Sequence, residues 1–323
     1  MRCHRRLVLA AGAGLAVLPR APWAQEAFPS RPLRLILPVV AGNGSDVFAR
    51  ALAKEMQALG GQPVLIDNRP GGNAVIAARA VLQSPADGYT LFFGSNASNA
   101  ANVATLKEPG FDPVADFAPV ALTVRARPVL AVGMDSPFRS IEQLVAAGKR
   151  DPALLSAACG STAHQMLVAM FARGAGVPVR IIPYKGTPQA VQDTVGGVVS
   201  LMIADAPTLM PMIQGGKLRP LVVTSDDRLP MLDAVPTVRE LGYGSIPLYS
   251  WAALFAPART PPAAVQRIAQ LAEQALRSEG MQRFAAEARV ELAYLGPAAL
   301  AAFQKDQIAV YREAVAVAGI EPQ

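Results

Sequence analysis

Two stretches decide the fold: Ala41-Gly42-Asn43-Gly44-Ser45-Asp46 and Ala158-Cys159-Gly160-Ser161-Thr162. Each follows a short apolar run of strand type and precedes a helical pattern, so each predicts a strand, a tight turn and a helix N-terminus. A helix N-terminus presents unpaired N–H groups and the positive end of the helix dipole, which favours an anion. The two stretches lie far apart in the chain and therefore predict two lobes that face one anion. Two ordinary capped helices are the alternative.

Outward from these stretches, strand and helix patterns alternate, which is typical of α/β architecture with parallel βαβ units. Strands are expected at residues 33–37, 63–66, 89–93, 119–124, 129–132, 154–158, 179–183, 201–204, 218–224 and 251–255. From residue 262 onward the pattern is nearly all helical, with helices expected at 262–278, 281–288 and 297–318.

Residues 1–24 have the composition of a secretory signal peptide. A basic start precedes an apolar run over residues 7–18, which is too short to span a bilayer, and Ala24 supplies a small residue for cleavage. The adjacent Arg5 and Arg6 leave open whether export follows the twin-arginine or the general secretory route. The protein is expected in the periplasm.

Charge and cysteine content exclude several classes of protein. The formal net charge is +6, but four arginines lie in residues 1–24 and no acid does, so the remainder carries +2. Without a basic cluster interleaved with aromatic residues, no nucleic-acid partner is expected. Outside the leader only Cys159 and His164 remain of their types, so no disulfide, metal site or cofactor is expected. A hydrolase using Cys159 or Ser161 as nucleophile is the enzymatic alternative.

An ordered set of short strings resembles the substrate-binding proteins of tripartite tricarboxylate transporters, the Bug-type periplasmic receptors. The resemblance spans residues 28–322. Its strings are residues 28–36, 38–46, 67–71, 85–91, 111–113, 160–164, 183–186, 215–219, 235–237 and 254–257. Asn43 departs from the family's usual glycine, and residues 73–75 lack the glycines that usually follow Pro70-Gly71.

The resemblance implies a two-lobe periplasmic-binding-protein fold of type II, with mixed, mostly parallel sheets and two hinge crossings. After the signal peptide at 1–24, it places residues 25–123 and 253–323 in lobe 1 and residues 124–252 in lobe 2. The ligand residues that it implies are Gly44, Ser45, Asp46, Ser95, Asn96, Ser161, Thr162, His164 and Asp205. No catalytic residue and no metal ligand is implied.

By the same resemblance, the protein is a non-enzymatic receptor for a small organic carboxylate: a di- or tricarboxylate, an amino acid or an aromatic acid. It works as a monomer and delivers the ligand to integral membrane transporter subunits. A ligand sensor for a membrane signalling partner is the alternative. Asp46 is expected to cap its helix. An exposed Asp205 would favour a ligand that carries an ammonium group.

Overall fold

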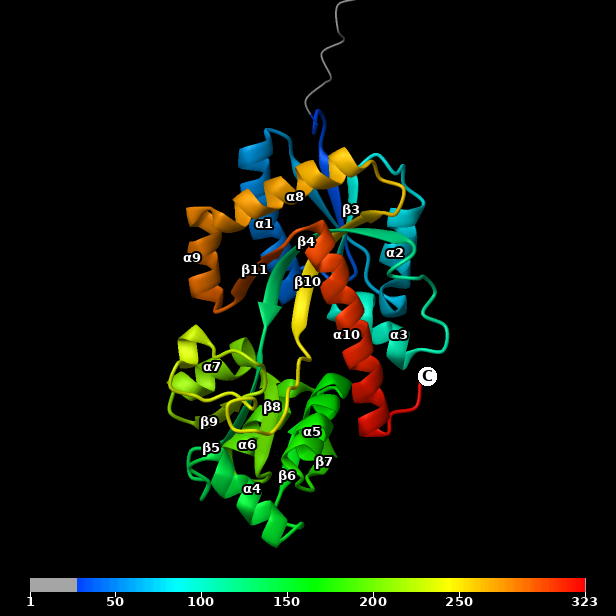
Figure 1. Cartoon of the computed structure of the whole chain (residues 1–323). Coiled ribbons are helices and arrows are strands. Elements are labelled where there is room, and N and C mark those ends of the chain that lie inside the picture. The colour runs from blue at the N-terminus through cyan, green and yellow to red at the C-terminus, as the bar shows by residue number, and fades with distance from the viewer. Residues whose placement is uncertain (1–27, 323) are drawn as a thin grey trace, which may run out of the picture.

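The computed structural model describes residues 28–322, which form two α/β lobes, one above the other (Figure 1). The predicted leader, residues 1–24, lies outside the described residues. None of the described helices is both long and apolar enough to cross a membrane. The two-lobe α/β fold expected from the sequence is confirmed.

Lobe 1 is built on a six-stranded sheet with the order β11-β4-β10-β3-β1-β2. Its strands are β1 (Leu33–Leu37), β2 (Val64–Asn68), β3 (Thr90–Ser95), β4 (Phe117–Ala126), β10 (Ser250–Pro257) and β11 (Glu291–Leu295). Its helices are α1 (Gly44–Gly60), α2 (Val75–Leu82), α3 (Asn102–Thr105), α8 (Pro262–Arg277), α9 (Glu279–Ala288) and α10 (Pro297–Ala318). The buried face of α1 carries Phe48, Leu52 and Met56, whose spacing of four residues places them on one side of the helix.

Lobe 2 is built on a five-stranded sheet with the order β7-β6-β8-β5-β9. Its strands are β5 (Pro128–Gly133), β6 (Ser156–Cys159), β7 (Arg180–Pro183), β8 (Leu201–Asp205) and β9 (Leu218–Val223). Its helices are α4 (Ile141–Arg150), α5 (Thr162–Ala175), α6 (Thr187–Val195) and α7 (Ala206–Gln214).

Both sheets are mixed, but antiparallel pairing has a larger share than the sequence indicated. The parallel pairs are β1 with β2 and β3, and β6 with β7 and β8. Strands β4, β5 and β10 instead run antiparallel to every partner. These three strands carry the chain into and out of the lobes, so they do not belong to βαβ units.

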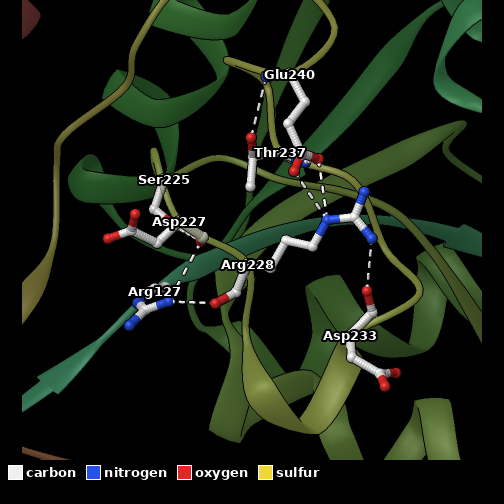
Figure 2. A network of polar contacts seen from close by, with 7 residues as sticks. All are labelled: Arg127, Ser225, Asp227, Arg228, Asp233, Thr237 and Glu240. Atoms are coloured by element: carbon white, nitrogen blue, oxygen red, sulfur yellow. Dashed lines mark hydrogen bonds and ion pairs between the residues drawn. The ribbon is translucent and has the colours of Figure 1, made fainter.

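The chain passes from lobe 1 to lobe 2 at Arg127, between the end of β4 and the start of β5, and returns before β10 begins at Ser250. Arg127 is 8% exposed and connects the lobes. Its Nη2 donates to Glu291 Oε1 in lobe 1 at 2.6 Å, and its Nη1 donates to the backbone carbonyls of Asp227 and Arg228 in lobe 2 at 3.3 and 2.5 Å. Figure 2 shows the lobe 2 side of this network.

Helix α10 belongs to lobe 1 by its N-terminal half and packs on α5 of lobe 2 by its C-terminal half (Figure 1). One apolar cluster therefore runs from Phe92 and Phe255 in lobe 1, past Tyr311 and Val315 of α10, to Phe171 of α5. On this side the two lobes share one core, and lobe 2 has a separate cluster beneath α6 and α7.

Two sequence expectations are wrong in detail. Residues 291–295, within the stretch expected to be nearly all helical, form the edge strand β11. Residues 206–214, for which no helix was expected, form α7. β11 exists because its backbone pairs with β4, which lies far away along the chain, and a helical period in the flanking sequence gives no sign of such a pairing.

Candidate functional site

The first predicted turn, between β1 and α1, is closed by Asn43. Its backbone is extended and its Oδ1 accepts a hydrogen bond from the Ser45 N–H at 2.9 Å, so Asn43 is the N-cap of α1. The expectation that Asp46 caps the helix is wrong, because Asp46 already lies inside the first turn. Gly44 and Ser45 are the first two residues of α1, at the positive end of its dipole. Gly44 is exposed and Ser45 is half-buried.

The Asp46 carboxylate faces its own loop and is 2% exposed. Oδ2 accepts from Arg50 Nε and from the Gly42 N–H, both at 2.9 Å, and Oδ1 accepts from Asn68 Nδ2 at 2.9 Å. The hydrogen bond from Arg50, reinforced by those from Gly42 and Asn68, lowers the pKa of Asp46 to about 2 although desolvation opposes this. Asp46 thus holds the loop in shape, and its own contact with a ligand stays a prediction.

The second predicted turn, between β6 and α5, is capped by Ser161, whose Oγ accepts from the His164 N–H at 3.3 Å. Gly160 is required here because a Cβ atom would lie 2.5 Å from the Thr187 backbone. The Gly160 N–H donates to His164 Nδ1 at 3.3 Å, so the imidazole ring braces its own turn. Ser161 and Thr162 lie at the helix N-terminus, and both are exposed.

The chemistry of Cys159 does not suit a nucleophile. Its side chain is fully buried, and burial raises the pKa of the thiol to about 12, so the reactive thiolate is absent at neutral pH. Burial also lowers the pKa of His164, whose Nδ1 lone pair is already occupied by the Gly160 N–H. The pair therefore forms part of the turn and does not constitute a catalytic couple.

Asn96, which follows β3, joins this strand to two other elements of lobe 1, α10 and β10. Its Nδ2 donates to the Tyr311 hydroxyl of α10 at 2.8 Å, and its Oδ1 accepts from the Trp251 N–H of β10 at 3.4 Å. Its neighbour Ser95 is half-buried, and the Ser95 N–H donates to Ser98 Oγ at 2.9 Å. Burial raises the pKa of Tyr311 to about 12, so its hydroxyl stays neutral.

Asp205 lies at the end of β8, where its backbone pairs with Pro128 just after the first crossing. The side chain is half-buried, and Oδ2 accepts a hydrogen bond from Ser250 Oγ at 2.6 Å. Burial raises the pKa of Asp205 to about 6, against the effect of that hydrogen bond. The ammonium-binding role proposed for Asp205 requires an exposed carboxylate, which this arrangement does not provide.

A cavity of about 380 Å³ between the lobes gathers part of the predicted site. It lies within the size range of small-molecule pockets. Its lining residues are Asn73, Asn96, Ala97, Ala101, Asn102, Thr105, Leu106, Ser161, Thr162, Ala163, Met166, Tyr311, Ile320 and Glu321. Of the predicted residues, Asn96, Ser161 and Thr162 meet there. Gly44, Ser45, Asp46, Ser95, His164 and Asp205 do not line it.

Asn73 and Ala74 were not among the predicted ligand residues, although they follow β2 at the same sheet edge as those residues. Both have left-handed backbones, with φ of 50° for Asn73 and 75° for Ala74, where glycine is the ordinary choice. Asn102 Nδ2 donates to the Asn73 carbonyl at 2.8 Å and holds this strained turn at the cavity wall. Strain of this kind is characteristic of functional sites. The departure from the family's glycines was the available sequence signal.

A second cavity and the arrangement of potential metal ligands among the described residues do not point to another site between the lobes. A larger hollow of about 590 Å³ lies on lobe 1 alone, between α10 and the loop at residues 109–114. Within residues 28–322, no group of three or more His, Cys, Asp or Glu side chains is arranged to hold a metal ion. The interlobe cavity therefore remains the best candidate for ligand binding.

Two α/β lobes, two crossings and a cavity between them that carries polar side chains define a periplasmic-type solute-binding protein. Residues 48–319 match the family described as the tripartite tricarboxylate transporter family receptor, TctC, and the chain belongs to this family.

Relatives of known name or structure agree with this assignment. Protein BugT of Bordetella pertussis is 35% identical over 285 residues, which cover 87% of this chain and 86% of BugT. The structure of Rpa4515 from R. palustris with adipate has a TM-score of 0.74 and 30% identity, and covers 92% of this chain and 100% of that one. MatC from Rhodopseudomonas palustris with bound malate has a TM-score of 0.68 and 26% identity, covering 89% and 100%.

The family is one of transporter receptors, and a solved relative at 29% identity is the periplasmic binding protein BugD, so this chain is a binding protein, not an enzyme. The hydrolase alternative is thereby excluded, in agreement with the buried thiol of Cys159.

Proposed function

We propose that this protein captures a small organic carboxylate between its lobes and delivers it to the membrane subunits of a tripartite transporter. It would do so in the periplasm as a single chain, after export by the leader at residues 1–24. The single observation that carries the proposal is the interlobe cavity, which Asn96 of lobe 1 lines together with Ser161 and Thr162 at the N-terminus of α5.

This cavity can bind a carboxylate through neutral hydrogen-bond donors at a helix N-terminus. The free N–H groups and dipole of α5 favour negative charge, and the hydroxyls of Ser161 and Thr162 add hydrogen-bond donors. Ligand binding by groups on both lobes would stabilise the closed arrangement, since only that arrangement makes all the contacts. The adipate and malate bound by two relatives of the same fold support this ligand class.

The test is calorimetric titration of adipate and malate into the wild type and into Ser161→Ala. Loss of the Ser161 hydroxyl removes a cavity donor, and we expect affinity to fall about tenfold. Ser140→Ala is the matched control, because Ser140 caps α4 in the same way, with its Oγ accepting from the Gln143 N–H at 3.4 Å, but lies outside the cavity.

Both variants should lose about 1 kcal/mol of stability as caps, and only Ser161→Ala should lose affinity. Equal affinity in both variants would contradict the placement of the site. A screen of small carboxylates that gives neither heat nor a melting shift in the wild type would contradict the ligand class.

A further inference from the structure

The described lining of the interlobe cavity contains amides, hydroxyls and apolar groups but only one residue with a charged side chain, Glu321. No Lys, Arg or His lies among these lining residues. A carboxylate ligand therefore meets no countercharge on this wall, and meets a like charge at one point. This imbalance bears on which carboxylates the protein accepts.

The backbone around Glu321 is held in place by the end of α10. Gly319 adopts φ of 63°, its N–H donates to the Ala316 carbonyl at 3.3 Å, and the Ile320 N–H donates to the Val315 carbonyl at 3.1 Å. These two bonds form a Schellman motif, which ends the helix in a defined direction. Ile320 then packs against the shared apolar cluster, and the next residue, Glu321, is exposed at the edge of the cavity that it lines.

The same segment faces the helix that is proposed to bind the ligand. α10 and α5 run antiparallel, since Glu313 pairs with Arg173 near the end of α5 while Ile320 and Met166 share the cavity wall near its start. Glu321 thus lines the same cavity as Ser161 and Thr162 at the α5 N-terminus.

We propose that Glu321 is a specificity-determining residue that disfavours each additional negative charge on the ligand. A second carboxylate on a ligand in this cavity of about 380 Å³ shares the cavity with Glu321. The preferred ligand is therefore a monocarboxylate whose other end is a hydroxyl, an amide or an ammonium group. This inference rests on the proposed function and refines its ligand class.

The test uses three probes of similar length: adipate, 6-hydroxyhexanoate and 6-aminohexanoate. Their net charges are −2, −1 and 0, so calorimetric titration at neutral pH isolates the effect of charge. Repulsion between like charges about 4 to 6 Å apart in a solvated site changes affinity by about three- to sixfold per charge. We expect Glu321→Gln to tighten adipate by that factor more than 6-hydroxyhexanoate, and to tighten 6-aminohexanoate least or to weaken it. Glu321→Lys should extend the same trend.

Glu142→Gln is the control, because Glu142 is an exposed glutamate of α4 that lines none of the cavities described above, and it should leave all three affinities unchanged. If the wild type binds the probes but Glu321→Gln shifts them equally or not at all, the selectivity role is overturned while the carboxylate function stands. If neither the wild type nor the variants bind any probe, the carboxylate function fails, and the selectivity role fails with it.

Discussion

The hydroxyl of Ser250 donates a 2.6 Å hydrogen bond to Oδ2 of Asp205, and this bond joins the two crossings between the lobes. Ser250 begins β10, where the chain re-enters lobe 1, and Asp205 pairs with Pro128, where the chain has just entered lobe 2. A half-buried carboxylate with a raised pKa thus lies between the two crossings. Its protonation should affect stability and not only binding.

Replacement of Asp205 by Asn should raise stability at pH 7.5. The pKa of Asp205 is raised from 3.8 to about 6 in the folded protein, so the folded state binds more protons than the unfolded state between these values. The contribution of Asp205 to stability is therefore greatest below pH 4, falls as pH rises toward 6 and stays reduced above it. The shift corresponds to about 2 to 3 kcal/mol at pH 7.5. Urea denaturation at pH 4.5 and 7.5 measures the free energy of unfolding of the wild type and of Asp205→Asn. If the change between the two pH values is the same in both proteins, the prediction is contradicted.

Replacement of Asp46 by Asn should have the opposite effect. Hydrogen bonding to Arg50 lowers the pKa of Asp46 from 3.8 to about 2, so this carboxylate stabilises the fold above pH 4 and loses that contribution as pH falls toward 2. We expect Asp46→Asn to cost about 2 kcal/mol at pH 7.5 and little near pH 2. Acid titration of the unfolding free energy measures this, and a cost that is independent of pH would show that only packing is lost.

Replacement of Ala74 by Gly should stabilise the protein. Ala74 has φ of 75°, a left-handed conformation that costs a residue with a Cβ atom about 1 kcal/mol, and glycine adopts it freely. We expect the unfolding free energy to rise by about 1 kcal/mol in urea denaturation. Ala80→Gly, within regular helix α2, is the matched control and should instead cost about 1 kcal/mol. A loss of stability in both variants would contradict strain at Ala74.

Replacement of Arg127 by Met should cost about 2 to 3 kcal/mol, because it removes a buried cation from Glu291 and leaves the Arg228 carbonyl without its donor. Glu291 keeps its bond from Arg125, and the Asp227 carbonyl keeps its bond from Ser225. A double-mutant cycle with Glu291→Gln should give a coupling above about 1 kcal/mol. Arg228→Met is the control from the same network (Figure 2), since the ion pair of Arg228 with Glu240 is largely exposed and is expected to contribute under about 1 kcal/mol. Equal costs for the two arginines would refute the role of Arg127 as the interlobe connection.

The sequence by itself determined the elements whose signals are local. The helix at residues 297–318 was predicted with the bounds that the structure shows, and the strand–turn–helix units around Gly44 and Ser161 were predicted in place. Apolar periodicity, glycine turns and capping serines depend on neighbours a few residues away, and the chain carries them wherever it folds.

Tertiary structure alone decided which side chains meet. Asn73, Tyr311 and Glu321 reach one cavity from segments far apart in the chain, and no local pattern marks Tyr311 or Glu321 as cavity residues. Asp46 was expected to cap its helix, but its carboxylate instead accepts a hydrogen bond from Asn68, 22 positions further along, and holds the loop in shape. The edge strand β11 likewise depends on β4. Such contacts depend on packing between distant segments, and they determine the shape and charge of the interlobe cavity.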